Sequence, residues 1–389
     1  MVPRKGHGQV IGLGLLVLAI WLVLIFLRGK FWACLDTDFD SPRVLTNWPS
    51  VVAVVPARDE AALIAKSLGS LLTQEYGGDF HVVLVDDQSS DGTADIARAL
   101  PGAEALTVLD GAAPPPGWTG KVWAMEQGFR HAREKFAPRL LLFTDADILH
   151  APDSLRMLVA RAEADVIGLT SLMALLRCES FAEKLLVPAF VYFFQMLYPF
   201  RWARDPRKRT GAAAGGCMLV RPDLLMTAGG LESMKGALID DCALALRMKT
   251  VGPVWLGLTK RVRSLRPYPG IGDIGRMISR SAYAQLKFSP MRLFGATLGL
   301  ALTFLAPVWL ALTAPGAAGL LGALALGLMI ASFMPINRFY GLSRAWAALL
   351  PLIAGVYMVY TVRSALDYHR GRGGMWKGRA QAPNGKGEA

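Results

Sequence analysis

The sequence has few cysteines and histidines, the residues that stabilise small secreted domains through disulfides or through bound metal. It contains four cysteines and five histidines in 389 residues, and no two cysteines form a C-x-x-C pair. That spacing is typical of zinc sites and disulfide frameworks, so neither is expected and the cysteines are predicted to be free thiols. No histidine stands in a ligand-spaced pair or a triad-like context, so none is assigned a catalytic role.

Charged residues are also scarce, at 19% of the chain, whereas 53% of the residues are hydrophobic and the mean hydropathy is +0.36. A soluble domain is usually less apolar, so part of the chain is expected to lie in a membrane. The net charge is +12, but the basic residues gather beside apolar segments, as at 201–209 and 369–379. Because they lack the interleaved aromatics of a nucleic-acid module, we expect anionic lipid as their partner and no nucleic acid.

An uncharged apolar run near the start of the chain, residues 10–27, has basic residues on both sides. Its length suits a helix that spans a bilayer. A cleavable signal peptide is the alternative, but the run is long for one and no A-x-A-like site follows it. We therefore expect a membrane anchor helix within residues 1–30.

Three more apolar stretches lie within residues 291–366, which are expected to form C-terminal transmembrane helices. If the middle of the chain is cytoplasmic, three full crossings would export the basic tail, residues 367–389, against the positive-inside rule. One stretch is therefore expected to be re-entrant or interfacial. Residues 345–362, which contain Pro351 and Gly355, are the best candidate.

The segment between the membrane regions, residues 48–290, alternates short apolar runs with helical patterns. VVAVVPA at 51–57 and HVVLVDD at 81–87 are typical of strands buried on both faces, and helical spacing follows each. This order predicts an α/β domain with a mainly parallel sheet. Two stretches, about 181–202 and 274–288, are predicted to be interfacial helices.

Three polar clusters follow predicted strands, where open α/β sheets bind their ligands. They lie at 58–60, 86–91 and 145–147. If the strand before the third cluster continues, alternation points Asp145 and Asp147 the same way. Two such carboxylates offer hard oxygen ligands for Mg²⁺ or Mn²⁺ that a diphosphate would share. The alternative is a polar strand end or a helix cap before Pro152.

A further acidic pair, Asp240 and Asp241, follows the glycine-rich segment 211–220 and opens a helical pattern. The helix dipole keeps a carboxylate at a helix N-terminus ionised, so that it can act as a general base. Aspartate is also a preferred N-cap, but a cap requires only one carboxylate. One of the two is therefore available for chemistry.

Five motifs in matching order and spacing resemble the family 2 glycosyltransferases of the GT-A fold. They are PARDE (56–60), VDDQSSDGT (85–93), GKVWAMEQG (120–128), TDAD (144–147) and IDDCALALR (239–247). The membrane segments at both ends and the terminal GMWKGR resemble the lipid-modifying branch, notably hopanoid-associated and carotenoid glycosyltransferases. The resemblance covers about residues 50–290.

The resemblance implies a Rossmann-like nucleotide-sugar-binding domain in a multi-pass protein of the inner membrane, with this domain facing the cytoplasm. It further implies an inverting hexosyltransferase that moves a sugar from a UDP-sugar to a hopanoid, a carotenoid or a related isoprenoid lipid. Metal dependence, through Mg²⁺ or Mn²⁺, is part of the same expectation.

The resemblance also implies roles for single residues. Contacts to the nucleotide-sugar are expected from Pro56, Ala57, Arg58, Glu60, Asp87, Lys121 and Asp145. Asp147, with Asp145, would bind the metal, and Asp241 would deprotonate the acceptor hydroxyl. The family more often has glutamate where this chain has Asp240, so the choice of base within the pair stays open.

Three alternatives are weighed against this interpretation. Processive synthases of the family carry a Q-x-x-R-W motif, of which residues 276–286 retain only Arg280. Arg276 and Arg280, one helical turn apart, could face a diphosphate or touch lipid phosphates. A non-catalytic nucleotide-sugar-binding membrane protein is disfavoured by the retained acidic clusters. A nucleotidyltransferase is disfavoured because no glycine-rich, basic phosphate loop lies near the N-terminus.

Overall fold

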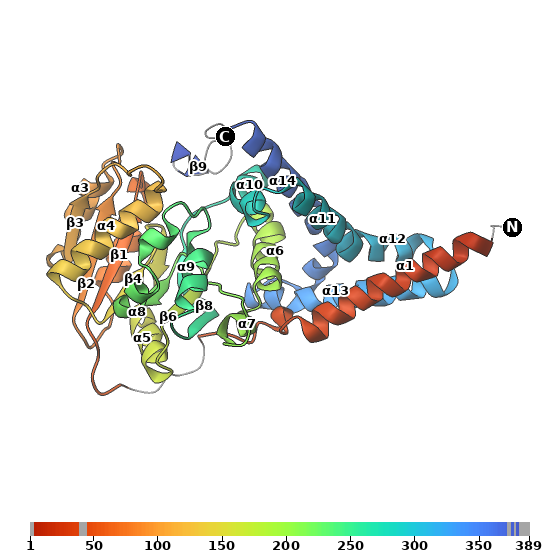
Figure 1. Ribbon diagram of the computed structural model, residues 1–389, viewed down its shortest axis with the longest axis horizontal. Coiled ribbons are helices and arrows are strands. Elements are labelled where there is room, and N and C mark those ends of the chain that lie inside the picture. Colours follow the sequence, from red (N-terminus) through yellow and green to blue (C-terminus); the bar gives the residue numbers. More distant parts are fainter. Residues whose placement is uncertain (1–3, 39–44, 372–374, 377–378, 381–389) are drawn as a thin grey trace.

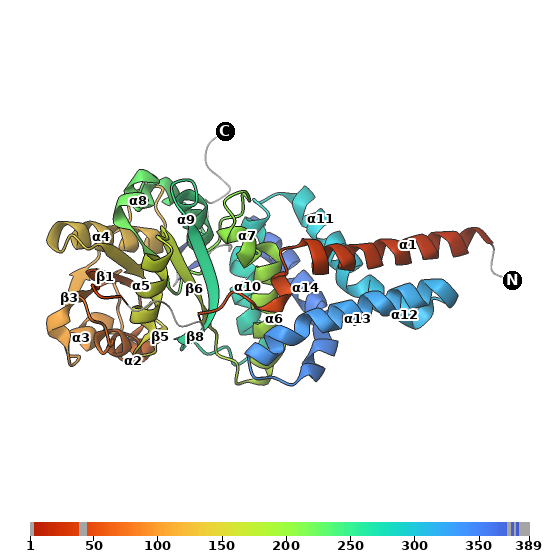
Figure 2. The ribbon, with the colours of Figure 1, turned by 90° about the horizontal axis from the view of Figure 1, so that it is seen from below.

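The computed structural model describes residues 4–38, 45–371, 375–376 and 379–380. An α/β domain forms one end of the molecule, and long apolar helices from both ends of the chain form the other (Figure 1). The view from below shows the same division (Figure 2). The predicted architecture of an α/β domain with apolar helices at both ends is therefore confirmed.

The α/β domain is built on an eight-stranded sheet with the order β3-β2-β1-β4-β7-β6-β8-β5. The strands are β1 Val51–Ala57, β2 Phe80–Asp86, β3 Leu106–Asp110, β4 Leu140–Phe143, β5 Ile148–His150, β6 Leu169–Leu175, β7 Met218–Val220 and β8 Val254–Ser264. The first four in this order are parallel, as predicted. In the other half, β7 runs antiparallel to β4 and β6, and β5 runs antiparallel to β8, while β6 and β8 are parallel.

Helices cover both faces of the sheet. They are α2 Ala61–Leu72, α3 Thr93–Arg98, α4 Gly120–Lys135, α5 Ser154–Ala164, α8 Pro222–Thr227 and α9 Asp240–Met248. Every residue of β1 is buried because its alternate side chains enter two different cores. Gly128 lets α4 approach β1 closely, since a Cβ there would lie 2.4 Å from Val54 Cγ1. The unbroken apolar run at 51–57 is therefore explained by helices on both sides.

The other end of the molecule consists of apolar helices. These are α1 Arg4–Leu22 with the π-helical turn η1 Val23–Leu27, α11 Pro290–Leu300, η5 Ala301–Leu305, α12 Ala306–Thr313, α13 Gly316–Phe339, the 3₁₀ segment η6 Arg344–Leu349 and α14 Leu350–His369. Four helical stretches are long and apolar enough to cross a membrane: Gly8–Leu27, Pro290–Thr313, Gly316–Phe339 and Arg344–His369. They contain the four apolar runs of the sequence.

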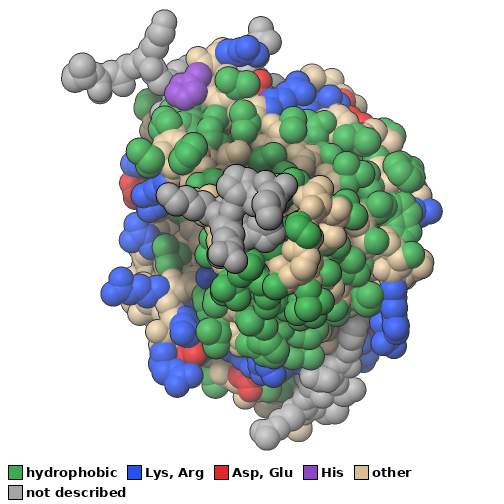
Figure 3. All heavy atoms as spheres, turned by 90° about the vertical axis from the view of Figure 1, so that its right-hand side faces the viewer, with side chains coloured by type: hydrophobic (Ala, Val, Ile, Leu, Met, Phe, Trp, Pro, Cys, Tyr) green, Lys and Arg blue, Asp and Glu red, His purple; other side chains and the backbone are tan. Residues whose placement is uncertain are grey.

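Seen end-on, the surface of this helical part is mostly hydrophobic, and Lys and Arg side chains lie around its edge (Figure 3). An apolar face with a basic rim is the pattern that lipid tails and anionic headgroups stabilise together. The basic tail predicted at 367–389 lies mostly outside the described residues, apart from its first positions and the short pair β9 Met375–Trp376 and β10 Arg379–Ala380.

Helices α6 Phe181–Leu197 and α10 Ile271–Gln285 lie between the α/β domain and the apolar helices in both views (Figures 1 and 2), with the short α7 Phe200–Arg204 after α6. Most side chains of α6 are buried, and Tyr192 Oη lies 2.7 Å from Ser332 Oγ of α13. The interfacial role of these two helices and the domain boundaries stay predictions.

Helix α14 takes a different path from the other long apolar helices. In Figure 1 it runs across the direction of α1 and α13, beside α10. Tyr283 N of α10 donates to Ser364 Oγ at 3.0 Å, which fixes this pairing. Pro351 lies in the first turn of α14, where its missing N–H is not needed, and the helix continues through Gly355. The stretch Arg344–His369 is also long and apolar enough to cross a membrane, so the re-entrant or interfacial course of residues 345–362 and the number of crossings stay predictions.

Candidate functional site

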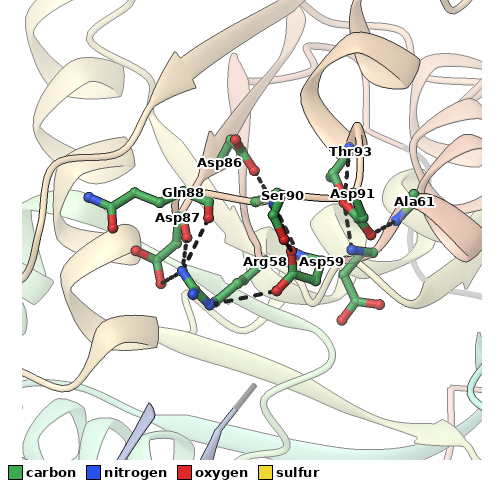
Figure 4. A network of polar contacts seen from close by, with 11 residues as sticks. Arg58, Asp59, Ala61, Asp86, Asp87, Gln88, Ser90, Asp91 and Thr93 are labelled. Atoms are coloured by element: carbon green, nitrogen blue, oxygen red, sulfur yellow. Dashed lines mark hydrogen bonds and ion pairs between the residues drawn. The ribbon is translucent and has the colours of Figure 1, made fainter. Parts of the chain in front are cut away.

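The loops after β1 and β2 are cross-linked by a polar network (Figure 4). Arg58 Nη1 donates to the backbone oxygen of Asp87 at 2.5 Å and lies 3.9 Å from its Oδ2. Asp59 Oδ1 accepts a hydrogen bond from Ser90 N at 2.9 Å. Asp87 is almost completely buried, and its N–H donates to Ala57 O at 2.8 Å. Arg58 and Asp87 are therefore held together at the carboxyl ends of adjacent parallel strands.

Other acidic residues of this motif hold the loops in shape. Asp91 Oδ2 accepts from Ala61 N, and its Oδ1 accepts from the hydroxyl of Thr93. Thr93 Oγ1 in turn accepts from Glu60 N at 2.9 Å. Asp86 accepts a short hydrogen bond from the hydroxyl of Ser89. Side-chain oxygens thus accept hydrogen bonds from backbone N–H groups at the starts of α2 and α3, where a helix offers these groups no acceptor of its own.

Lys121 joins three of the sequence motifs. It lies in the first turn of α4, and its Nζ is 2.9 Å from Asp145 Oδ1 and 3.2 Å from Asp240 Oδ2. Burial by itself lowers the pKa of Lys121, but the two carboxylates outweigh it and raise the pKa above its usual range. The lysine is therefore charged, and it brings the segment after β4 and the start of α9 to one point.

Asp241, next in the chain, is held by backbone donors. Its Oδ2 accepts from Gly215 N at 2.9 Å and its Oδ1 from Cys242 N at 2.7 Å. Burial raises the pKa of Asp241 to about 6, and the neighbouring charge of Asp240 adds to the rise. A Cβ at position 215 would lie 3.2 Å from Lys121 Nζ, so the glycine brings its backbone close to the lysine. A carboxylate with a pKa near neutrality is suited to accept a proton.

Arg266 forms the second cationic bridge of the site. It lies in the segment after β8, and its Nε is 2.7 Å from Asp147 Oδ2 while its Nη2 is 2.7 Å from Glu60 Oε1. Arg266 belongs to none of the five motifs and was therefore not predicted as a site residue. Its one available signal is its place two positions after β8, close to the end of a strand, where polar residues of this domain gather.

Asp145 and Asp147 come together for a reason other than strand alternation. β4 ends at Phe143, and a turn separates it from β5, so the strand does not continue through the two aspartates as the alternation argument required. Lys121 binds one of them and Arg266 the other. Burial raises the pKa of Asp145, and the nearby charge of Asp147 raises it further.

The described residues contain no cluster of three or more side chains that could hold a metal ion. Mg²⁺ and Mn²⁺ do not need such a cluster, since they are commonly bound by one or two carboxylates, water and the phosphates of a ligand. Asp147 and Asp145 supply oxygens of this kind within one turn. The donor set therefore fits a metal shared with a ligand, and a site made of protein side chains alone is not present in the described part.

The other predicted site residues take no part in the ion pairs of Lys121 and Arg266. Pro56 and Ala57 are buried in β1 and can offer a ligand only their backbone. Arg276 and Arg280 are exposed on α10, and Arg276 pairs with Asp273 of its own helix. Their contact with a diphosphate stays a prediction. All four cysteines are free thiols, as predicted, and burial raises the pKa of Cys217 and Cys242 far above the range of a nucleophilic thiol.

Comparison with known proteins agrees with this geometry. Residues 49–257 match a family model described as "Glycosyltransferase like family 2". The mannosyltransferase PcManGT from Pyrobaculum calidifontis, solved in complex with GDP-Man and Mn²⁺, has a TM-score of 0.54 at 21% identity over 92% of this chain and 98% of that one. A comparison with curated proteins gave no match.

Two further solved structures are similar at lower scores. Mannosyl-3-phosphoglycerate synthase from Rubrobacter xylanophilus has 16% identity over 59% of this chain and 70% of its own, with a TM-score of 0.36. S. aureus TarS 1-349 in complex with UDP-GlcNAc has 14% identity over 83% and 92%, with a TM-score of 0.35. Because the family model matches more than half of the chain, the protein belongs to the glycosyltransferase-like family 2, and its catalytic domain has the GT-A fold.

Proposed function

We propose that the protein is a membrane-bound inverting glycosyltransferase that moves a sugar from a UDP-sugar to the hydroxyl of a lipid, a hopanoid or a related isoprenoid. The reaction takes place at the cytoplasmic face of the inner membrane, where nucleotide sugars are available. The observation that carries this proposal is the bridge from Lys121 to Asp145 and Asp240, beside Asp241. A lysine that could neutralise a diphosphate and a carboxylate that could accept a proton lie close together there, which supports the proposal.

Asp241 takes the proton of the acceptor hydroxyl in the proposed reaction. The acceptor oxygen forms a bond to the anomeric carbon while the bond from that carbon to the diphosphate oxygen breaks, and its electron pair leaves with UDP. The hydrogen bonds from Gly215 N and Cys242 N hold the carboxylate in place for this step. The Lys121 ammonium stabilises the charge that develops on the leaving diphosphate.

Asp147 and Asp145 would hold Mg²⁺ or Mn²⁺ when the donor is bound. The metal would supply neutralisation of the leaving diphosphate. Arg266 partly neutralises Asp147 and Glu60, so the acidic residues do not repel one another. The loops that carry Arg58 and Asp87 would bracket the nucleotide base and ribose.

The lipid acceptor is supported by the helical part of the molecule. Four apolar helices and a hydrophobic end face give the protein a place in the membrane (Figure 3). Helix α10 and the segment before it lie between those helices and the acidic residues. A hydroxyl at the membrane surface could therefore reach Asp241 without leaving the bilayer completely.

The proposal is tested by nucleoside diphosphate release from the detergent-purified protein. The panel contains UDP-sugars and, because one similar structure was solved with GDP-Man, GDP-mannose. Each donor is offered with a hopanoid, a carotenoid or a ceramide, with and without Mn²⁺. UDP release that requires one lipid and adds a single sugar supports the proposal. Release with a GDP-sugar corrects the donor, products with many sugars indicate a processive synthase, and donor binding without release on any lipid contradicts a transferase.

The pH dependence of the reaction is expected to follow Asp241. Its pKa is raised to about 6, and only the ionised carboxylate accepts a proton. The value of kcat/KM should therefore fall about tenfold per pH unit below pH 6 and level off above it. Initial rates of UDP release between pH 4.5 and 8.5 measure this profile. A profile that is flat through pH 6 contradicts the assignment of Asp241 as the base.

Replacing Asp147 with alanine is expected to abolish the effect of metal on donor binding. The variant loses the carboxylate assigned to the metal, which should weaken binding of the UDP-sugar in Mn²⁺ about ten- to a hundredfold. Binding without Mn²⁺ should not weaken, because Arg266 loses one of its two carboxylate partners, keeps Glu60, and has its Nε available to the diphosphate. Calorimetric titrations with and without Mn²⁺ separate the two effects. The exposed Asp165→Ala is the control, and equal Mn²⁺ titrations in both variants would remove the role of Asp147.

A further inference from the structure

An open, apolar groove of about 620 Å³ lies among the helices at the membrane end of the molecule. It is bounded by the start of α10, by η5 and α12, and by α14. Residues that line it include Ile271, Leu305, Trp309, Leu352, Gly355 and Val359. The volume is within the range of about 300–1,000 Å³ that small-molecule sites have.

Two glycines decide how tightly the helices around the groove pack. Tyr360 of α14 lies against Gly275 of α10, where a Cβ would come within 2.1 Å of the tyrosine ring. Tyr360 Oη also donates to Ile271 O at 3.4 Å. Gly355, one turn earlier in α14, is the opposite case, because a Cβ there meets nothing within 4 Å. Gly275 therefore allows α10 and α14 to pack closely, whereas Gly355 leaves the groove open.

The groove is connected to the acidic residues by a single short segment. Ile271 is five positions after Arg266, which contacts Asp147 and Glu60, so the two points are at most about 18 Å apart. The segment between them is fixed, since Tyr268 N donates to Glu183 Oε1 of α6 at 2.7 Å. Glu183 is fully buried and also accepts the backbone N–H groups of Glu179 and Ser180. A ligand in the groove would therefore have one end close to the catalytic domain.

We propose that this groove binds the hydrocarbon part of the acceptor lipid and directs its hydroxylated end along residues 266–271 towards Asp241. The inference rests on the proposed function and adds the place where the acceptor is recognised. An apolar lining excludes a free sugar or a phosphate as the occupant of the groove itself. The connection to the acidic residues favours the reacting lipid over the lipids that surround the spanning helices, whose chains need no such path.

Gly355→Phe tests the inference, because Gly355 lines the groove and a Cβ there meets no protein atom within 4 Å, so a side chain can be added at this point. Gly327→Phe in α13 is the matched control: it is exposed, a Cβ there also meets nothing within 4 Å, and it does not line the groove. The full chain is placed in phospholipid nanodiscs and photolabelled with a diazirine-bearing isoprenoid alcohol, and separately with a diazirine-bearing phosphatidylcholine. This measurement needs no turnover.

The isoprenoid probe should label peptides of α14 and of the start of α10 in preference to α1 and α13, and the phosphatidylcholine probe should not. Gly355→Phe should lower this labelling about tenfold, since loss of contact for two methylene groups is enough for that change, and Gly327→Phe should not. Equal labelling by both probes, or equal labelling of both variants, would show an ordinary lipid-facing surface and overturn the inference.

Kinetics separate the failure of the groove from the failure of the proposed function. With an active enzyme, Gly355→Phe should raise the KM for the long-chain lipid about tenfold, and leave unchanged both UDP-sugar binding and the KM for a short, water-soluble alcohol with the same end group. An equal rise in KM for both acceptors would contradict the groove. An enzyme without transfer activity that shows the preferential labelling would keep the groove and reject the glycosyl acceptor as its ligand.

Discussion

Asp241→Asn is expected to lower the turnover number about 10²- to 10⁴-fold, the usual contribution of a positioned general base. The amide has nearly the shape of the carboxylate and can still accept one of the two hydrogen bonds from Gly215 N and Cys242 N. It cannot take up the proton of the acceptor hydroxyl. Binding of the donor should change little, because Lys121 forms its ion pairs with Asp145 and Asp240.

Steady-state rates of UDP release and a separate measurement of donor affinity distinguish these effects. Asp240→Asn is the parallel variant, and it should weaken donor binding more than Asp241→Asn does, because it removes a partner of Lys121. The acid limb of the pH profile should disappear in Asp241→Asn alone. Near-normal turnover in Asp241→Asn, with loss of turnover in Asp240→Asn, would assign the base to Asp240.

The parallel half of the sheet could be predicted because its signals are local. β1, β2 and β4 are short runs of buried, mostly branched residues, and each is followed by polar residues that end it. Of the two carboxylates that pair with Lys121, Asp145 follows β4, whereas Asp240 opens α9, which lies between β7 and β8 in the chain. Carboxyl ends of parallel strands meet at one edge, so position in sequence was enough to group the clusters after β1, β2 and β4 but not Asp240.

The antiparallel half of the sheet and the Arg266 bridge could not be predicted in the same way. Arg266 meets Asp147 and Glu60 across 119 and 206 positions of the chain. Such a contact depends on how β5 and β8 pair, and β5 is only three residues long. The role of Glu183 could not be predicted from the sequence either. There its charge only argues against a membrane span, whereas in the structure it caps α6 and binds the segment that leads to α10.

Composition alone located the apolar helices, but it could not give their directions. The runs at 294–312, 317–334 and 345–362 have similar hydropathy, and each lies in a helix long enough to cross a membrane. Its pairing with α10 distinguishes α14, as when Ser279 Oγ of α10 donates to Tyr360 O at 3.1 Å. The basic residues that follow α14 are the reason why this stretch was predicted not to cross the membrane completely. Cysteine-accessibility labelling on both sides of α14 would test that topology.

Lys121→Met is expected to lower kcat/KM about 10²- to 10³-fold, the loss found when one preorganised group that stabilises transition-state charge is removed. The substitution keeps the apolar stem but leaves Asp145 and Asp240 without their shared cation. Because that cation also lowers the pKa of Asp241, its loss should raise this pKa above about 6 and shift the acid limb of the profile to higher pH.

A lysine that only stabilised the fold would not move the pH profile, so the profile decides between the two roles. Lys121→Arg should keep the acid limb near its original position while lowering the rate, since a guanidinium restores the charge with a different shape. Lys135→Met, at the exposed end of the same helix, should change neither rate nor profile. If Lys121→Met loses activity with an unshifted profile, the lysine is not electrostatically coupled to the base, and the grouping of Asp145, Asp240 and Asp241 into one catalytic unit fails.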